Sequence, residues 1–124
     1  MNKQHELVIV GAGLVGLALA ASLALSARHH RLRITLVDMG RAAEFAADDE
    51  TGLRVYALSV GSLGFLQSAG VQDDMLAGRA CPYRDMRVWD ESGSAEGHAT
   101  LHFSAAEFAL PQLGVIVEDN LLRY

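Results

Sequence analysis

The sequence predicts an α/β fold, and two observations carry this prediction. An apolar run at Leu7–Val10 precedes a glycine-rich turn and an Ala-rich helical stretch, and a second apolar run lies at Arg33–Val37. Further along, two stretches alternate apolar and polar residues around a turn, which is typical of an antiparallel hairpin. With 124 residues the chain is one domain's worth. We therefore expect a βαβ core with a hairpin attached.

The βαβ unit is predicted over residues 7–38. Leu7–Val10 is rich in β-branched residues, as buried strands prefer. Leu14 to about Arg28 predicts a helix that is apolar nearly all round and therefore buried. Arg33–Val37 predicts a second buried strand, which ends at Asp38. Strands joined by a helix are expected to be parallel, with a right-handed crossover. Basic residues near the end of this helix suit its dipole: Arg28, His29 and His30.

The uncharged stretch Leu7–Ala27 has two other interpretations. It is long enough to span a bilayer, and it resembles a signal peptide in length. Its glycines argue against both, because glycine costs roughly 1 kcal/mol inside a helix. A strand, a glycine turn and a helix explain the same residues more simply.

Beyond the βαβ unit, residues 40–53 predict a polar loop with some helix, in which Asp48, Asp49 and Glu50 are solvated. A helix is expected from Ser59, as N-cap, to Ala69, with Gly70 just past its end. Asp73–Ala77 predicts a further short helical turn.

The hairpin is predicted over residues 85–103. Asp85–Trp89 and Thr100–Phe103 alternate as strands, and we expect Trp89 in the hairpin core. Leu113–Tyr124 predicts an apolar strand or loop that becomes helical around Glu118. The sequence stops there without a C-cap, so we expect the chain to be cut within an element.

Composition excludes several classes of protein. Hydrophobic residues make up 51% and charged residues 20%, which is too apolar for a disordered chain. The net charge of −5 leaves no basic footprint, so no nucleic-acid partner is expected. A single cysteine, Cys81, excludes a disulfide framework and a Cys-based zinc site, and fits the reducing cytoplasm. Cys81 has no adjacent His or Lys to lower its pKa and is expected to serve packing.

The motif that carries chemistry is G-x-G-x-x-G, placed after a strand and opening a helix. Its first glycine makes the tight turn, the second lets a pyrophosphate approach the backbone, and the third allows close helix–strand packing. The pyrophosphate would meet the positive end of the helix dipole. The predicted cofactor-binding residues of this motif are Gly11, Ala12, Gly13, Leu14, Val15 and Gly16.

Asp38 follows the second strand at the spacing of the acid that binds ribose hydroxyls. A carboxylate there would repel a 2′-phosphate, which disfavours NADP at this site. The sequence thus predicts a Rossmann-like dinucleotide-binding core that suits NAD and FAD equally.

Two further stretches make the chain resemble a known family. With the glycine motif, Arg54–Ser59 is similar to the class A flavin monooxygenases. Pro82–Asp90, with its Val-Trp-Asp, and Leu113–Asn120, with Leu-Gly-x-x-x-Glu-x-Asn, resemble the ubiquinone-biosynthesis hydroxylases, the UbiH/UbiF/VisC/Coq6 group. The resemblance covers nearly the whole chain. One departure is Asp38, where flavoproteins more often carry Glu.

The resemblance implies an FAD domain. Later Asp-Gly and Gly-Asp motifs of the family have no counterpart, so residues 1–124 are expected to be the N-terminal portion of a single FAD-binding domain. It implies that Arg54 reaches toward the FAD. It also implies a hydroxylase of a polyprenylated phenol or quinol: NAD(P)H reduces the flavin, and a flavin C4a-hydroperoxide transfers one oxygen to the ring. No residue of this segment is expected to be catalytic in its own right.

Alternatives stay open at this point. The chain could be a dinucleotide-binding fragment without catalysis, or part of an NAD-dependent dehydrogenase, although no Tyr-x3-Lys or placed His supports the latter. No metal site is expected, because His98, His102 and Glu96 lack a further spaced ligand. The resemblance leaves open a peripheral association with the inner membrane or with other ubiquinone-biosynthesis enzymes. The fragment alone is expected to self-associate through open apolar faces and a free sheet edge.

Overall fold

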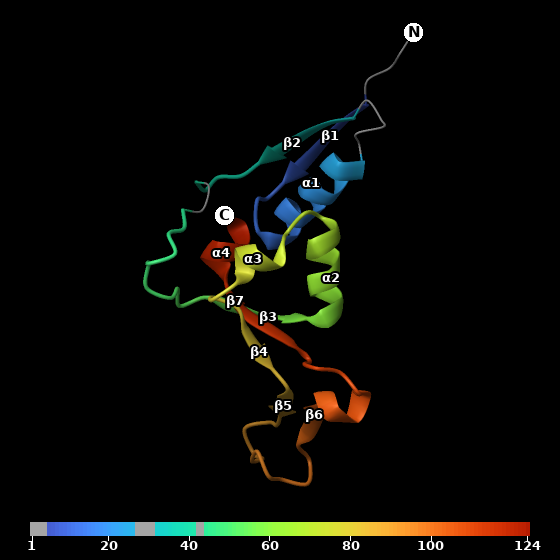
Figure 1. Ribbon diagram of the computed structural model, residues 1–124, viewed down its shortest axis with the longest axis vertical. Coiled ribbons are helices and arrows are strands. Elements are labelled where there is room, and N and C mark those ends of the chain that lie inside the picture. Colours follow the sequence, from blue (N-terminus) through green and yellow to red (C-terminus); the bar gives the residue numbers. More distant parts are fainter. Residues whose placement is uncertain (1–4, 27–31, 42–43) are drawn as a thin grey trace.

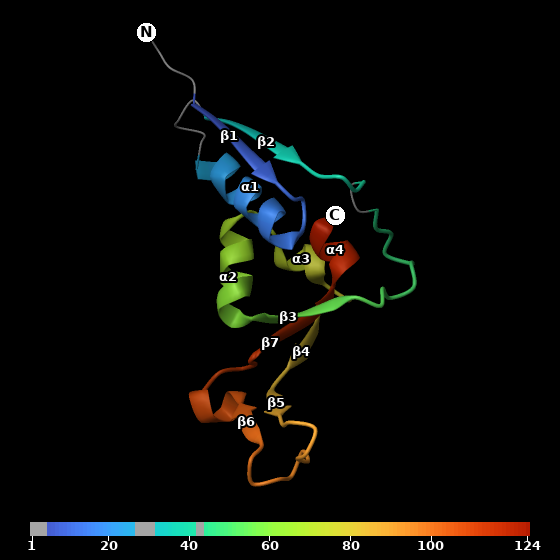
Figure 2. The ribbon, with the colours of Figure 1, turned by 180° about the vertical axis from the view of Figure 1, so that it is seen from behind.

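The computed structural model describes residues 5–26, 32–41 and 44–124, and it is a mixed α/β structure (Figure 1). Three small sheets occur in this part of the chain, with strand orders β1-β2, β3-β7-β4 and β5-β6. The β1-β2 pair and the β5-β6 hairpin lie at opposite ends of an elongated molecule, and the three-stranded sheet lies between them (Figures 1 and 2).

The predicted βαβ unit is present. Strand β1 (His5–Val10) leads through helix α1 (Leu14–Ser26) to strand β2 (Leu32–Val37), and the two strands are parallel, with Leu7 opposite Ile34. The strand–turn–helix interpretation of the uncharged stretch is therefore confirmed over residues 7–26. The predicted end of the helix, with Arg28, His29 and His30, lies outside the described residues.

The expected burial of this unit is wrong for this chain. Ile9 faces α1 and is buried, but Val10 on the other face of the sheet is 83% exposed. Helix α1 has no fully buried residue, and Val15 in its first turn is 81% exposed. The reason is that an apolar surface is buried only where another element covers it, and in the described structure α1 covers one face of the pair.

The central sheet was only partly predicted. Strand β7 (Gly114–Glu118) lies between β3 (Val55–Ser59) and β4 (Cys81–Tyr83), antiparallel to both. The apolar run after Leu113, for which the sequence allowed a strand or a loop, is thus a strand. The sequence does not mark β3 and β4 as strands, because such short strands form only through pairing with a segment far away in the sequence. The expectation of some helix within residues 40–53 is also wrong, because residues 44–53 contain none.

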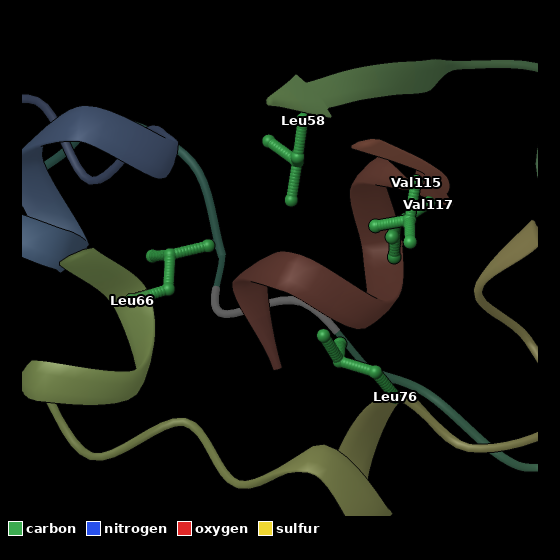
Figure 3. Packing of buried hydrophobic residues seen from close by; sticks show 5 residues of the cluster. All are labelled: Leu58, Leu66, Leu76, Val115 and Val117. Atoms are coloured by element: carbon green, nitrogen blue, oxygen red, sulfur yellow. The ribbon is translucent and has the colours of Figure 1, made fainter. Parts of the chain in front are cut away.

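Helices pack on this sheet and form the core. Helix α2 (Val60–Ser68) begins as predicted, with Ser59 as N-cap accepting the Ser62 N–H at 3.2 Å. Gly70 follows its C-cap with φ +103°, a conformation that favours glycine. The predicted turn after it is α3 (Asp73–Leu76), and the predicted helical end is α4 (Asp119–Arg123). Figure 3 shows the cluster that these elements enclose: Leu58, Leu66, Leu76, Val115 and Val117.

The predicted hairpin is confirmed as an antiparallel pair of β5 (Asp85–Val88) and β6 (Leu101–Ser104), followed by the 3-10 helix η2 (Ala105–Phe108), which the sequence did not predict. Trp89 was wrongly expected in a core: it is half exposed, because no layer covers the hairpin in the described structure. Cys81 was likewise expected to pack and is exposed on β4.

The exposed apolar face of the β1-β2 pair generates a prediction. Val10 and Val37 lie opposite each other on this face, beside free strand edges, so we expect the 124-residue chain to form dimers or larger assemblies. The double substitution Val10→Lys/Val37→Lys should weaken assembly, because charge on such a surface opposes association. Leu53→Lys, a similarly exposed position in a loop, is the control and should change nothing. Sedimentation measures the state, and a monomeric unsubstituted chain would contradict the prediction.

Candidate functional site: the glycine loop and its neighbours

The glycine loop joins β1 to the first turn of α1. Gly11 has φ +104°, and its N–H donates to the carbonyl of Val37 at 2.8 Å, which closes the loop against the end of β2. The first helical bond runs from the Leu17 N–H to the Gly13 carbonyl at 3.0 Å. The N–H groups of the first turn therefore have no intrahelical acceptor, and the first turn carries no acidic side chain. Such an end is suited to an anion.

The other two glycines differ in what a side chain would meet. A Cβ on Gly16 would lie 1.9 Å from the Gly11 carbonyl oxygen, so only glycine allows the helix to lie this close to the loop. A Cβ on Gly13 would meet nothing within 4 Å. Gly13 thus borders open space beside the helix terminus, where an approaching phosphate would find room.

Asp38 lies against the loop. One carboxylate oxygen, Oδ2, accepts the Ala12 N–H at 2.6 Å, and the other accepts the Gly40 N–H at 2.6 Å. The bonds from Ala12 and Gly40, together with the positive charge of Arg123, hold the pKa of Asp38 below its ordinary value. The group is therefore an ionised acceptor at neutral pH. The structure brings the predicted acid and the predicted glycine loop together.

Arg54 lies at a different place, just before β3. It is exposed, its guanidinium carbon lies 5.4 Å from the centre of the Tyr56 ring, and its carbonyl accepts the Asp119 N–H at 2.8 Å. No hydrogen bond or ion pair among the described residues joins Arg54 to the glycine loop. The connection between them runs through α4, which packs on α1 and whose first residue is Asp119.

A buried ion pair holds the segment before Arg54. Glu118, at the end of β7, is 3% exposed, and its Oε1 lies 2.5 Å from both Nε and Nη2 of Arg79. Its Oε2 accepts the Gly52 N–H at 2.7 Å. The bonds from Arg79 and Gly52 lower the pKa of Glu118.

The sequence does not reveal this ion pair. Glu118 belongs to the Leu-Gly-x-x-x-Glu-x-Asn pattern, but no local pattern marks Arg79 as its partner, because the two residues meet only through the fold.

The remaining candidates concern a metal site and a membrane span. No group of three or more His, Cys, Asp or Glu suited to a metal ion occurs in the described ranges. His102 Nε2 lies 3.0 Å from Asp85 Oδ1 across the hairpin, at the exposed surface. Of the helices in the described part of the chain, none combines the length and the apolar character needed to cross a bilayer.

Known proteins resemble the chain over almost its full length. It is 37% identical over 122 residues to the 3-demethoxyubiquinol 3-hydroxylase of Escherichia coli (strain K12), which covers 98% of this chain and 29% of that protein. It is 33% identical over 119 residues to the mitochondrial ubiquinone biosynthesis monooxygenase COQ6 of Xenopus tropicalis, and 31% identical over 121 residues to that of Homo sapiens. These matches cover 95% and 97% of this chain. No protein-family model matches it.

All these relatives are hydroxylases or monooxygenases by name. The chain is thus similar to the ubiquinone-biosynthesis hydroxylases of the UbiH/UbiF/Coq6 group, and the family resemblance predicted from the motifs is confirmed. It spans 24% to 29% of the length of these three relatives.

The close contact at Gly16 leads to a prediction about stability. Gly16→Ala should destabilise the chain by about 1–3 kcal/mol, because its methyl group would overlap the Gly11 carbonyl. Gly64→Ala is the matched control: it lies in α2 with nothing within 4 Å, and it should stabilise by about 0.5–1 kcal/mol through helix propensity. Thermal unfolding measures both. Equal stability of the two variants would contradict the close contact at Gly16.

Because of the Glu118–Arg79 pair, we expect the stability of the folded chain to fall in acid. Because the folded pKa of Glu118 lies below its ordinary value of 4.5, the contribution of this carboxylate to stability is complete above that value. It is lost as pH falls through the folded pKa. Glu118→Gln, measured by thermal unfolding against pH, should start less stable and lose less stability on acidification than the unsubstituted chain. If the stability of both proteins fell equally with pH, Glu118 would make no contribution to the acid sensitivity.

Proposed function

We propose that the chain forms part of the FAD-binding domain of an FAD-dependent monooxygenase that hydroxylates the aromatic ring of a polyprenylated phenol or quinol in ubiquinone biosynthesis. The observation that carries the proposal is the glycine loop, whose Ala12 N–H donates to the Asp38 carboxylate. The relatives of this chain are named 3-demethoxyubiquinol 3-hydroxylase and ubiquinone biosynthesis monooxygenase. The β1-α1-β2 unit would then be a Rossmann-like dinucleotide-binding core.

The residues of the loop fit the diphosphate of such a cofactor. Gly13 leaves open space at the end of α1, where free N–H groups and the helix dipole favour negative charge. The Ala12 N–H is already taken by Asp38, so the N–H groups from Gly13 onward are the ones left to meet a phosphate. Gly13, Leu14, Val15 and Gly16 would present their N–H groups to the phosphates. Gly11 and Ala12, whose N–H groups bond to Val37 and Asp38, would hold the loop in shape.

Asp38 fits the ribose of the same cofactor. Each carboxylate oxygen accepts one backbone N–H and has acceptor capacity left for a ribose hydroxyl. Its lowered pKa keeps it charged, which supports a ribose with free hydroxyls and opposes a 2′-phosphate. Arg54 would lie toward the flavin half.

The chain's own share in the reaction is to bind and orient. When bound, FAD supplies the redox and oxygen-transfer chemistry, with NAD(P)H as the reductant. The glycine loop and Asp38 fix the ADP half in place, and no residue of this segment is assigned an acid or base role. Of the alternatives, a dinucleotide-binding segment without catalysis uses the same loop, whereas an NAD-dependent dehydrogenase would retain no flavin on purification. Flavin absorbance of the purified protein separates the FAD and NAD assignments.

The partners and the location follow from the same proposal. The substrate would be a polyprenylated aromatic ring, and a protein acting on so apolar a molecule would work in the cytoplasm at the inner membrane surface, or beside other enzymes of ubiquinone biosynthesis. The COQ6 relatives carry the word mitochondrial in their names.

Asp38→Ala in the full-length protein tests the assignment. Loss of a charged acceptor should weaken FAD binding roughly ten- to a hundredfold. Gly13→Val should abolish flavin retention, because a branched side chain would fill the open space beside the loop.

Asp90→Ala is the matched control for this test. Asp90 is an exposed carboxylate that also accepts a backbone N–H, that of Ser92, but it lies in the hairpin. The FAD affinity of the Asp90→Ala variant should equal that of the unsubstituted protein. Unchanged affinity in Asp38→Ala, or normal flavin content in Gly13→Val, would remove the FAD assignment from this loop.

A further inference from the structure

The segment that leads into Arg54 is held by few bonds. Residues 44–53 form no helix or strand, yet they connect the Asp38 region to the start of β3. Three hydrogen bonds tie the end of this segment down. The Gly52 N–H donates to Glu118 at 2.7 Å, the Asp49 carbonyl accepts from Arg79 Nη1 at 2.9 Å, and the Arg54 carbonyl accepts from the Asp119 N–H at 2.8 Å.

Arg79 links these bonds to one another. Its guanidinium pairs with the buried Glu118 carboxylate and donates to the Asp49 carbonyl at the same time. It also lies over the Phe45 ring, 5.3 Å from its centre. Because Gly52 binds the second oxygen of the same carboxylate, displacing Arg79 would loosen both ends of residues 49–52. Arg54 follows two residues later.

We propose that Arg79 is a positioning residue for Arg54: its bonds to Glu118 and to the Asp49 carbonyl fix residues 49–54 and so hold Arg54 where it would contact bound FAD. This inference rests on the proposed function, since it takes FAD as the cofactor. Arg79 itself touches neither the glycine loop nor Asp38 by any hydrogen bond or ion pair that the described residues make. Its influence on the cofactor passes through the backbone.

The conservative substitution separates positioning from stability. Removing Arg79 altogether would leave the Glu118 carboxylate buried without its partner, which is strongly destabilising in general. Arg79→Lys keeps the positive charge beside Glu118. A single ammonium group cannot reproduce the planar fork that serves the carboxylate and the Asp49 carbonyl together. The lysine variant should therefore fold and still release residues 49–52.

The experiment uses the full-length protein with Arg79→Lys, with Arg54→Ala, and with both. Arg87→Lys is the matched control, because Arg87 pairs with Glu96 at 3.7 Å on the exposed hairpin. Amide hydrogen exchange without FAD should become faster at Gly52 in Arg79→Lys and stay unchanged in Arg87→Lys. FAD affinity should fall roughly three- to tenfold in Arg79→Lys. The double variant should bind FAD no more weakly than Arg54→Ala alone, because Arg79 acts through Arg54.

Several results would overturn the inference. Unchanged FAD affinity in Arg79→Lys, while Arg54→Ala binds FAD more weakly, would reject positioning and leave the proposed function intact. Additive losses in the double variant would reject it as well, because Arg79 would then act independently of Arg54. Unchanged exchange at Gly52 would remove its structural basis. An unsubstituted protein that binds no FAD would instead reject the proposed function itself, and the inference with it.

Discussion

The Glu118 carboxylate at the end of β7 is the constraint on which the rest of the structure depends. β7 is the middle strand of the central sheet, its side chains Val115 and Val117 lie in the core, and Glu118 at its end is 3% exposed. A buried carboxylate is tolerated only when it is paired. Arg79 and the Gly52 N–H supply the partners, from segments remote from β7 in sequence. One side chain therefore fastens the sheet, the connection from α3 to β4 and the long loop together.

The two regions proposed to bind the cofactor depend on the fold in different ways. The glycine loop is closed by bonds within the β1-α1-β2 unit: Gly11 to the Val37 carbonyl, Ala12 to Asp38, and the close contact of Gly16 with Gly11. Arg54 is placed by Asp119 and by the bonds around Glu118, so it depends on the central sheet. Helix α4, which packs on α1 and begins with Asp119, is where the two regions meet.

The exposure of apolar side chains to solvent differs between parts of the molecule. The sheet between the two ends encloses a small core in which Val117 is 1% exposed, whereas the β1-β2 pair and the β5-β6 hairpin each present apolar side chains to solvent. Their backbone hydrogen bonds are made even so, because strand pairing needs only the neighbouring strand, while burial needs a further layer. Regular secondary structure and a covered core are separate requirements, and these two pairs meet the first without the second.

What the sequence by itself determined is local. The parallel β1-α1-β2 unit, the Ser59 cap, the hairpin and the glycine loop with Asp38 all follow from residues close together in the chain, where periodicity, turn chemistry and capping act directly. Only the tertiary structure decided that Val55–Ser59 and Cys81–Tyr83 are strands, since both become strands by pairing with β7. It alone decided that Arg79 meets Glu118 and that Val10, Val15 and Trp89 stay exposed. Burial and ion pairing depend on which distant segments come together, and no local pattern of side chains specifies that.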